Sequence, residues 1–560
     1  MGRKRSEISL GLLLLVSVEL TVYTVISVSI PQYDILRYPL GLIQQLPPVY
    51  WSAEISSVLT VLLASAFHGR LSERFYGYVI GMGYALMVFN SFFVFYFVNP
   101  VFILSRDELG HAAEVFTLLT NHNTVAVKGI YEADYPLAYL YGAFSYAASG
   151  LNPTFYFLYF SPMFYTIFQV LCVYAFIRLF LRSPYSEVGA VIYAFSSIPF
   201  YASEWSPQLM SYNLLFPIFL LMGMIVKKGG VKFLPLLMVF STLTGLTDIA
   251  TFTTSVIASL ALIPSMRGLR ALKSHRLFGY TAFTASTAYL YWVLFNPAAA
   301  GAIAGDLNLV SQFLNFLRYA FLPQTPSNLN LPSSQLISTF LPPSPYHFYS
   351  VASKLLEGGI FLLLSLASFA FLAWRGKANG DLRLLMIVGS TLLVAQGAVG
   401  LVNNVSNVLT RMIPQVMVFY TVIILQFLDH ANALNSRAIK AFLLAGLTLN
   451  VPLSILGYTT IATTEHSSPA AFYAGEVLGR YGISSISTYD FYSTLYEYDG
   501  NLTPSLGLTS NHLEFAGPYV QVLSIYFNGP NLKGYDRYYN SILENGTVIL
   551  NTGDLLVSAG

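Results

Sequence analysis

The stretch SRDELGHAAE, residues 105–114, directly follows an apolar run that ends at Leu104. It places the acidic pair Asp107 and Glu108 at the edge of a segment that is apolar enough to lie in a membrane. Charged side chains at such an edge cost free energy unless they face water, pair with another group or carry out chemistry. The way the rest of the chain is arranged around this stretch decides both the fold and the candidate function.

The composition is that of an integral membrane protein. Of the 560 residues, 55% are hydrophobic and only 10% are charged, whereas an average soluble domain has about 25% charged residues. The mean hydropathy is +0.60. No basic run of the kind that binds nucleic acid is present, so nucleic acid is not expected as a partner. The one cysteine, Cys172, excludes an intrachain disulfide and a cysteine-based metal site.

Apolar windows predict an all-α polytopic membrane protein with about thirteen transmembrane helices. The predicted spans are 8–30, 52–68, 76–98, 160–182, 187–201, 209–226, 231–247, 249–263, 278–295, 352–374, 384–402, 412–428 and 441–462. The first span follows the basic sequence GRKR (2–5) and lacks a cleavage site of small residues. We therefore expect a retained signal anchor rather than a removed signal peptide.

The Lys and Arg residues orient these spans in the cell membrane. With the N-terminus in the cytoplasm, most of the 28 Lys and Arg residues fall on short inner loops, as the positive-inside rule requires. This distribution holds only if the short apolar piece 137–150 does not cross the membrane. We expect that piece to be a re-entrant or surface-lying helix on the outer side.

The same orientation divides the chain into four regions. Residues 1–98 form N-terminal transmembrane helices, 99–159 an outer acidic loop, 160–462 a helical core with the outer loop 296–351, and 463–560 an extracytoplasmic tail. The tail is polar, with turn sequences between strand-like runs such as TVIL (547–550) and DLLVS (554–558), and with a helix-like run at 468–482. We expect a small α/β or β-rich domain there.

The acidic loop has a helical pattern of apolar residues from Asp107 onward, which places Asp107, His111 and Glu114 on one face. Two interpretations are open. The segment is either a solvated amphipathic helix whose acidic residues cap its first turn, or the carrier of functional carboxylates. The three side chains could hold a divalent cation, Mg or Mn. The alternative is that His111 only orients a neighbour through a hydrogen bond.

From these residues onward the chain resembles the GT-C glycosyltransferases. These are polytopic enzymes that use lipid-phosphate-linked sugars, and they include oligosaccharyltransferases, protein O-mannosyltransferases and aminoarabinose transferases. The resemblance rests on the pair Asp107 and Glu108, on the YP sequence (135–136) before an apolar helix, and on the corner GLNP (150–153). It covers residues 100–230 well and weakens up to about 430, and archaeal members of the family also carry a soluble outer tail.

Two features depart from the family pattern. The acidic loop follows the third predicted span, whereas in the family it follows the first, so two spans would be an N-terminal addition. The tail lacks the WWDYG-type motif of oligosaccharyltransferases, which argues against transfer of an N-linked oligosaccharide. The acceptor therefore stays open among a protein, a glycan and a lipid.

The resemblance implies a polyprenyl (dolichyl) phosphate-linked sugar donor whose lipid lies in the membrane and whose phosphate lies at the outer interface. Asp107 is then the first candidate for the base that activates the acceptor, and Glu108 is the second. The leaving phosphate needs positive charge, for which Arg411 is best placed and Arg318 comes second. Plain interfacial snorkelling is the alternative for Arg411. The other substrate-binding candidates are His111, Asp134 and Tyr135.

Four further residues carry weaker expectations. Asp248, between two spans on the outer side, is either a second acid of the site or a polar turn residue. Glu204 is a loop residue or a substrate contact, and Trp205 beside it is expected to anchor the membrane interface. Glu19, which we take as the only charge in a mid-span position, should face other helices because it is costly in lipid.

Two other classes of protein compete with the transferase. One is a transporter or flippase of lipid-linked or small polar cargo, which the scarcity of mid-span charges disfavours. The other is a non-catalytic scaffold or anchor for an envelope assembly, which the tyrosine-rich tail suits. Alanine at Asp107 and Glu108 distinguishes them, since it should abolish catalysis but leave the assembly of a scaffold intact.

Overall fold

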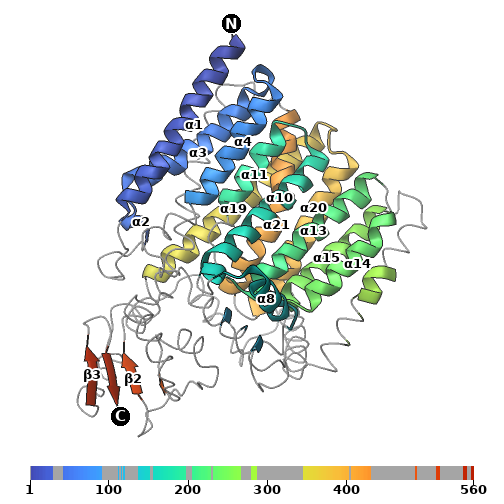
Figure 1. The fold of residues 1–560 in the computed structure, drawn as a ribbon. Helices are drawn as coiled ribbons and strands as arrows, with labels where there is room; N and C mark the ends of the chain where they lie inside the picture. Colours follow the sequence, from blue (N-terminus) through green and yellow to red (C-terminus); the bar gives the residue numbers. More distant parts are fainter. Residues whose placement is uncertain are drawn as a thin grey trace.

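The computed structural model describes a bundle of long helices with a small sheet beyond one end (Figure 1). It describes residues 2–28, 42–90, 136–151, 155–196, 205–228, 231–266, 279–284, 345–402 and 405–430, single positions between 111 and 119 and at 286 and 290, and four strands after residue 485. The N-terminus lies at one end of the bundle, and α8 (Pro136–Ser149) and the strands lie at the other. We call these the N-terminal end and the α8 end.

The first unit of the bundle consists of three long helices and one short one. These are α1 (Gly2–Ser27), α2 (Leu42–Gln45), α3 (Pro48–Ala66) and α4 (Glu73–Val88). The hydroxyl oxygens of Ser17 and Thr60 lie 3.3 Å apart and join α1 to α3. A Cβ at Gly83 would lie 2.5 Å from the side chain of Val61, so glycine allows α4 to approach α3 closely.

The rest of the described bundle consists of eight helices. They are α10 (Ser161–Phe180), α11 (Tyr185–Ser196), α13 (Pro207–Lys228), α14 (Leu234–Gly245), α15 (Ile249–Met266), α19 (Pro345–Trp374), α20 (Gly380–Val402) and α21 (Val405–His430). The ring of Phe419 on α21 lies 5.7 Å from that of Phe176 on α10 and 4.8 Å from that of Phe219 on α13. These three buried aromatic side chains hold the centre of the bundle together.

The described helices coincide with the predicted spans over most of the chain. Four of them are long and apolar enough to cross a membrane by length and composition: Lys4–Ser27, Pro48–Ala66, Ser161–Phe180 and Pro207–Lys227. Shorter apolar helices are Leu234–Gly245, Thr251–Ala261, Gly358–Trp374 and Gln415–His430. The helical character of the chain is confirmed, while the number of thirteen spans stays a prediction because the span 441–462 lies outside the described residues.

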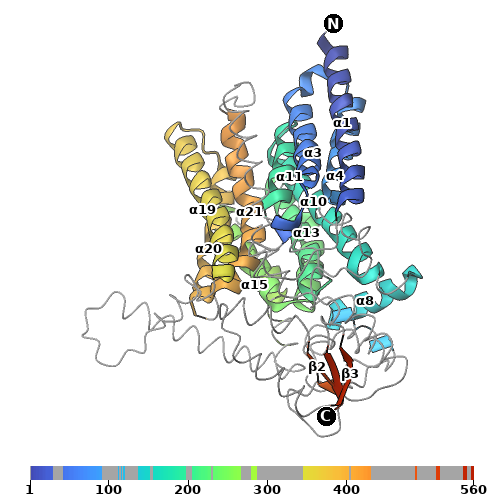
Figure 2. The same cartoon turned by 90° about the vertical axis from the view of Figure 1, so that its left-hand side faces the viewer.

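The piece 137–150 is a helix at the end of the bundle, as the distribution of positive charge required. It forms α8, which lies across the bundle rather than along it (Figure 2). One side of α8 is buried at Ala138 and Tyr139, whereas Leu140 and Phe144 are 48% and 75% exposed. A short helix with one packed side and one exposed apolar side suits the surface of a membrane.

The C-terminal strands form a four-stranded sheet in the order β1–β2–β4–β3. Their bounds are Ile486–Ser487, Leu513–Ala516, Thr547–Asn551 and Leu556–Ala559 for β1 to β4. The pair β1–β2 is parallel and the other two pairs are antiparallel. The strands predicted at 547–550 and 554–558 correspond to β3 and β4. The helix predicted at 468–482 lies outside the described residues, so the full C-terminal domain stays a prediction.

Two acidic residues of the first unit lie in apolar helices, and one of them differs from its prediction. Glu19 was expected to face other helices, but it is exposed on the outside of α1. It was also taken as the only charge in a mid-span position; Glu54, near the start of the predicted span 52–68, lies inside α3 and is 1% exposed. The apolar pattern of α1 has no marked polar side, so the sequence did not show which face of this helix would be covered.

Candidate functional site

The described part of the acidic segment is helical and packs against the bundle. His111, Ala112, Val115, Leu118 and Leu119 are all in helical conformation. Val115 and Ala112 are 0% and 2% exposed and belong to the main hydrophobic core. This confirms, for these positions, the helical periodicity predicted from Asp107 onward. Asp107, Glu108 and Glu114 themselves lie outside the described residues.

His111 is joined to α8 by a hydrogen bond. The hydroxyl of Tyr139 lies 2.7 Å from Nδ1 of His111, and which of the two atoms donates depends on the tautomer of the ring. Tyr139 is 0% exposed, so this hydrogen bond is shielded from water and fixes the orientation of the imidazole. The prediction of a hydrogen-bonded, orienting histidine agrees with this geometry.

Trp205 completes an aromatic cluster around this hydrogen bond. Its ring centroid lies 6.5 Å from that of His111, 6.0 Å from that of Tyr139 and 5.1 Å from that of Phe157. The expectation that Trp205 anchors the membrane interface was wrong, because its side chain is 0% exposed. It precedes α13 directly and is buried among segments that the sequence alone did not bring together.

Gly142 on α8 makes this packing possible. A Cβ at this position would lie 2.4 Å from the ring of Trp205 and 3.1 Å from the side chain of Val115. The separation from Trp205 is too short for any side chain, and the separation from Val115 would be tight, so glycine at this position allows α8 to approach Trp205 closely. The three segments 111–119, α8 and the start of α13 therefore form one packed unit at the α8 end.

Asp248 acts as the N-terminal cap of α15. Its Oδ2 accepts hydrogen bonds from the backbone N–H of Thr251 at 2.9 Å and from the Thr251 hydroxyl at 2.5 Å. The Thr251 hydroxyl in turn lies 2.8 Å from the hydroxyl of Ser211 on α13. Of the two roles considered for Asp248, the polar turn residue is the one that these hydrogen bonds describe. The same turn adjoins the site, because the N–H of Leu137 on α8 donates to the carbonyl of Leu246 at 3.3 Å.

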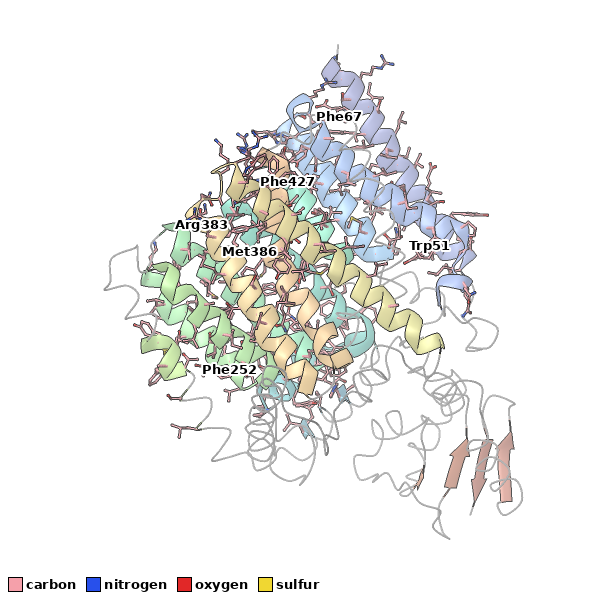
Figure 3. All side chains as sticks on the ribbon, turned by 180° about the vertical axis from the view of Figure 1, so that it is seen from behind. Trp51, Phe67, Phe252, Arg383, Met386 and Phe427 are labelled. Atoms are coloured by element: carbon pink, nitrogen blue, oxygen red, sulfur yellow. The ribbon has the colours of Figure 1, made fainter. Side chains whose placement is uncertain are left out.

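Arg411 lies in the first part of α21, at the same end of the bundle. One turn later, Gln415 accepts a hydrogen bond of 2.9 Å from the hydroxyl of Thr254 on α15. At the other end of α21, the carbonyl of Leu428 accepts a hydrogen bond from Tyr185 at the start of α11. The backbone of Arg411 is thus at the end of α15 that Asp248 caps. Figure 3 shows Phe252, one turn into α15, toward this end and Arg383 toward the opposite one.

The other predicted site residues cannot be placed. Asp134, Tyr135, Arg318 and Glu204 lie outside the described residues, as do the two carboxylates of the proposed metal site. Among the residues described, no group of three or more His, Cys, Asp or Glu side chains could hold a metal ion.

Sequence reasoning missed a second buried polar cluster at the N-terminal end. The carboxylate of Glu187, 3% exposed, accepts hydrogen bonds from Ser183 at 2.6 Å and Ser186 at 2.9 Å. It also pairs with Arg178 at 3.2 Å, and its backbone carbonyl accepts from Tyr84 at 2.7 Å. These contacts fix the corner between α10 and α11 against α4. The cluster is fully satisfied, which is typical of a structural role.

The fold and the site together define a multi-pass helical membrane protein in which a histidine-bearing, acidic segment is seated on a surface helix at one end. No family model and no curated protein matched the sequence. Among solved structures, similarity is found to the oligosaccharyltransferase of Archaeoglobus fulgidus tethered to an acceptor peptide that contains the NVT sequon. The match covers 76% of this chain and 67% of that chain, with 11% identity and a TM-score of 0.45.

At this identity and TM-score the likeness does not by itself define a shared activity. The case for function therefore depends on the residues of this chain and on their geometry.

The substitution Tyr139→Phe tests the seat of the acidic segment. It removes the hydroxyl that bonds to His111 and keeps the ring, so the free energy of unfolding should fall by about 1 kcal/mol. Amide hydrogen exchange in residues 111–119 should become faster, while Tyr78→Phe, on an exposed tyrosine of α4, should change neither quantity. Unchanged exchange in Tyr139→Phe would show that this hydrogen bond does not hold the segment.

Proposed function

We propose that this protein is a glycosyltransferase that moves a sugar from a polyprenyl (dolichyl) phosphate-linked donor to an acceptor on the outer face of the membrane. The observation that carries the proposal is the buried hydrogen bond between Tyr139 and His111. It fastens the segment that follows Asp107 and Glu108 to a surface helix at one end of a membrane bundle. In a charge-poor protein, fastening the segment that follows an acidic pair at such a place favours chemistry at the interface.

The physical form of the donor agrees with this position. A polyprenyl chain must lie in the hydrocarbon while the phosphate and the sugar lie at the interface. The exposed apolar side chains of α8, among them Leu140 and Phe144, support a position of this helix at the same depth. The bond between the sugar C1 and the phosphate oxygen would then lie level with the acidic segment.

In the proposed reaction, Asp107 takes the proton of the acceptor as the acceptor atom attacks C1 of the sugar. Glu108 is the second candidate for this base. The bond between C1 and the phosphate oxygen breaks, and free polyprenyl phosphate leaves with the electron pair. The remaining substrate contacts are assigned to His111, Asp134 and Tyr135.

The negative charge that develops on the leaving phosphate needs a cation close by. Arg411 is proposed for this role and Arg318 is second, because a guanidinium group binds two phosphate oxygens at once. A divalent cation, Mg or Mn, held by Asp107, His111 and Glu114 would supply further positive charge at the phosphate. Addition of a chelator followed by each metal tests this part separately.

The proposal is tested by supplying the purified protein with labelled polyprenyl-phosphate hexoses and a native membrane extract as acceptor. Transfer of label into protein, glycan or lipid supports it and identifies the acceptor class. If label is carried across sealed vesicles without transfer, the protein is a transporter. If the label is neither transferred nor transported, with several sugars and with both metals, the result supports the hypothesis of a non-catalytic scaffold.

The substitution Arg411→Ala should weaken binding of the donor phosphate. Loss of a charge-assisted hydrogen bond corresponds to about 10- to 100-fold in kcat/KM, and Arg411→Lys should recover part of it. Steady-state kinetics with varied donor measure both effects, and Arg383→Ala, exposed at the N-terminal end, is the matched control. If Arg411→Ala and Arg383→Ala have equal kinetics, Arg411 does not bind the donor phosphate. Its role would then be the alternative one, in which its side chain only reaches the membrane interface.

A further inference from the structure

The outer face of α1 carries an acidic residue in the middle of an apolar stripe. Glu19 is exposed there. Five large apolar side chains of the same face are also exposed: Ile8 at 63%, Leu12 at 58%, Leu15 at 54%, Val22 at 55% and Ile26 at 74%. We call these five residues and Glu19 the α1 seam.

The opposite face of α1 is packed against the bundle. The seam is therefore on the outer side of this helix. Leu10 and Leu14 are 3% and 6% exposed, and Ser17 lies 3.3 Å from Thr60 of α3. Glu19 comes two residues after Ser17, about 200° further around the helix. It therefore points away from α3 and α4.

The depth of Glu19 makes its exposure costly. The apolar helix Lys4–Ser27 has 24 residues, and Glu19 lies within it, about two turns from the nearer end at Ser27. A glutamate side chain is too short to reach the interface from there, as longer basic side chains do from helix ends. A carboxyl group in hydrocarbon needs a hydrogen-bonding partner, and within the described residues the structure shows no hydrogen bond to the carboxyl group of Glu19.

The spacing of the seam indicates what covers it. Its residues follow one another at intervals of four, three, four, three and four positions, which is the repeat of the core positions in a two-helix coiled coil. Glu19 takes one of these core positions, where a single polar residue sets the register and the number of helices.

We propose that α1 pairs with α1 of a second copy of this chain, with the two Glu19 carboxyl groups in contact. All copies are inserted in one orientation, so two α1 helices that meet are parallel. A symmetric parallel pair brings each seam residue opposite its own copy. A carboxyl group is both donor and acceptor in its acid form, so two of them can satisfy each other in the membrane.

Cysteine cross-linking tests the geometry of this pair. The only cysteine, Cys172, is buried in α10, so a Cys172→Ala background accepts new single cysteines. In vesicles of phosphatidylcholine and phosphatidylglycerol, Leu15→Cys and Val22→Cys should form disulfide-linked dimers on mild oxidation. Leu13→Cys and Leu20→Cys, on the flanks of α1, are the matched controls and should form few. Equal cross-linking at all four positions, or none at any, would overturn the proposal.

Two substitutions of Glu19 test its role in the pair. Glu19→Gln keeps a donor and an acceptor and should retain the dimer, whereas Glu19→Leu should weaken self-association by about tenfold. Energy transfer between labelled copies on dilution with lipid measures the affinity, and an unchanged elution profile in detergent shows that each variant is folded. Equal affinity for both variants would contradict the proposal. The proposal would also be contradicted if, in native membranes, the cysteine variants formed cross-links to a different protein and formed no dimer of this chain.

Discussion

Asp107→Ala is expected to abolish sugar transfer by this protein. The residue is the proposed base, and loss of a general base lowers the rate by about 10²- to 10⁴-fold. Because Asp107 precedes the part of the segment that packs against α8, the variant should leave the hydrogen bond between Tyr139 and His111 in place. Label incorporated from a polyprenyl-phosphate hexose, measured for the wild type and the variant at equal protein, gives the result.

Glu73→Gln is the matched control for this experiment. Glu73 is an exposed acidic residue in the first turn of α4, at the N-terminal end of the bundle, far from the proposed site along the membrane normal. Its substitution should leave transfer unchanged. A wild-type rate in Asp107→Ala together with a large loss in Glu108→Gln would move the role of the base to Glu108, and full activity in both would remove the acidic pair from the mechanism.

Trp205→Ala is expected to give the largest loss of stability. The indole is fully buried and is packed against the rings of Tyr139, Phe157 and His111. Truncating a buried tryptophan costs about 3–5 kcal/mol, because the surrounding atoms collapse only partly into the cavity. Thermal unfolding in detergent, followed by the near-ultraviolet signal of the aromatic residues, measures this loss. Transfer activity should fall with it, since the acidic segment loses part of its seat.

Trp374→Ala provides the comparison. Trp374, at the end of α19, is 78% exposed; it makes a cation–π contact with Arg375 at 5.1 Å and an edge contact with the ring of Phe371 at 6.2 Å. Its truncation should change the free energy of unfolding by about 0.5–1 kcal/mol at most. If the two tryptophan variants unfold at the same temperature, the aromatic cluster does not hold the α8 end together.

The positions of the helices could be predicted from the sequence, because the length of an apolar run is a local property of the chain. A run of about twenty apolar residues predicts a membrane helix whatever it packs against, and α1, α3, α10 and α13 lie where they were predicted. The position of α8 across the end of the bundle could also be predicted, since the charge distribution did not allow 137–150 to cross. The strands β3 and β4 followed from alternating apolar residues between turns.

The contacts between helices could not be predicted, because they depend on which faces meet. Trp205 has the composition of an interfacial anchor, and only the close approach of α8 at Gly142 buries it. Glu19 and Glu54 are both acidic residues in apolar helices, yet one is exposed and the other is 1% exposed. Within the candidate site, the sequence offered an orienting role as one alternative for His111 but gave no sign that Tyr139 would be its partner.

Release of free polyprenyl phosphate tests the central claim most directly. Purified wild-type protein is mixed with a polyprenyl-phosphate hexose and native membrane extract, and free lipid phosphate and transferred sugar are measured in the same sample. The account predicts that one polyprenyl phosphate is released for every sugar transferred. No release from a folded, monodisperse preparation, with several sugars and with either Mg or Mn, would contradict it.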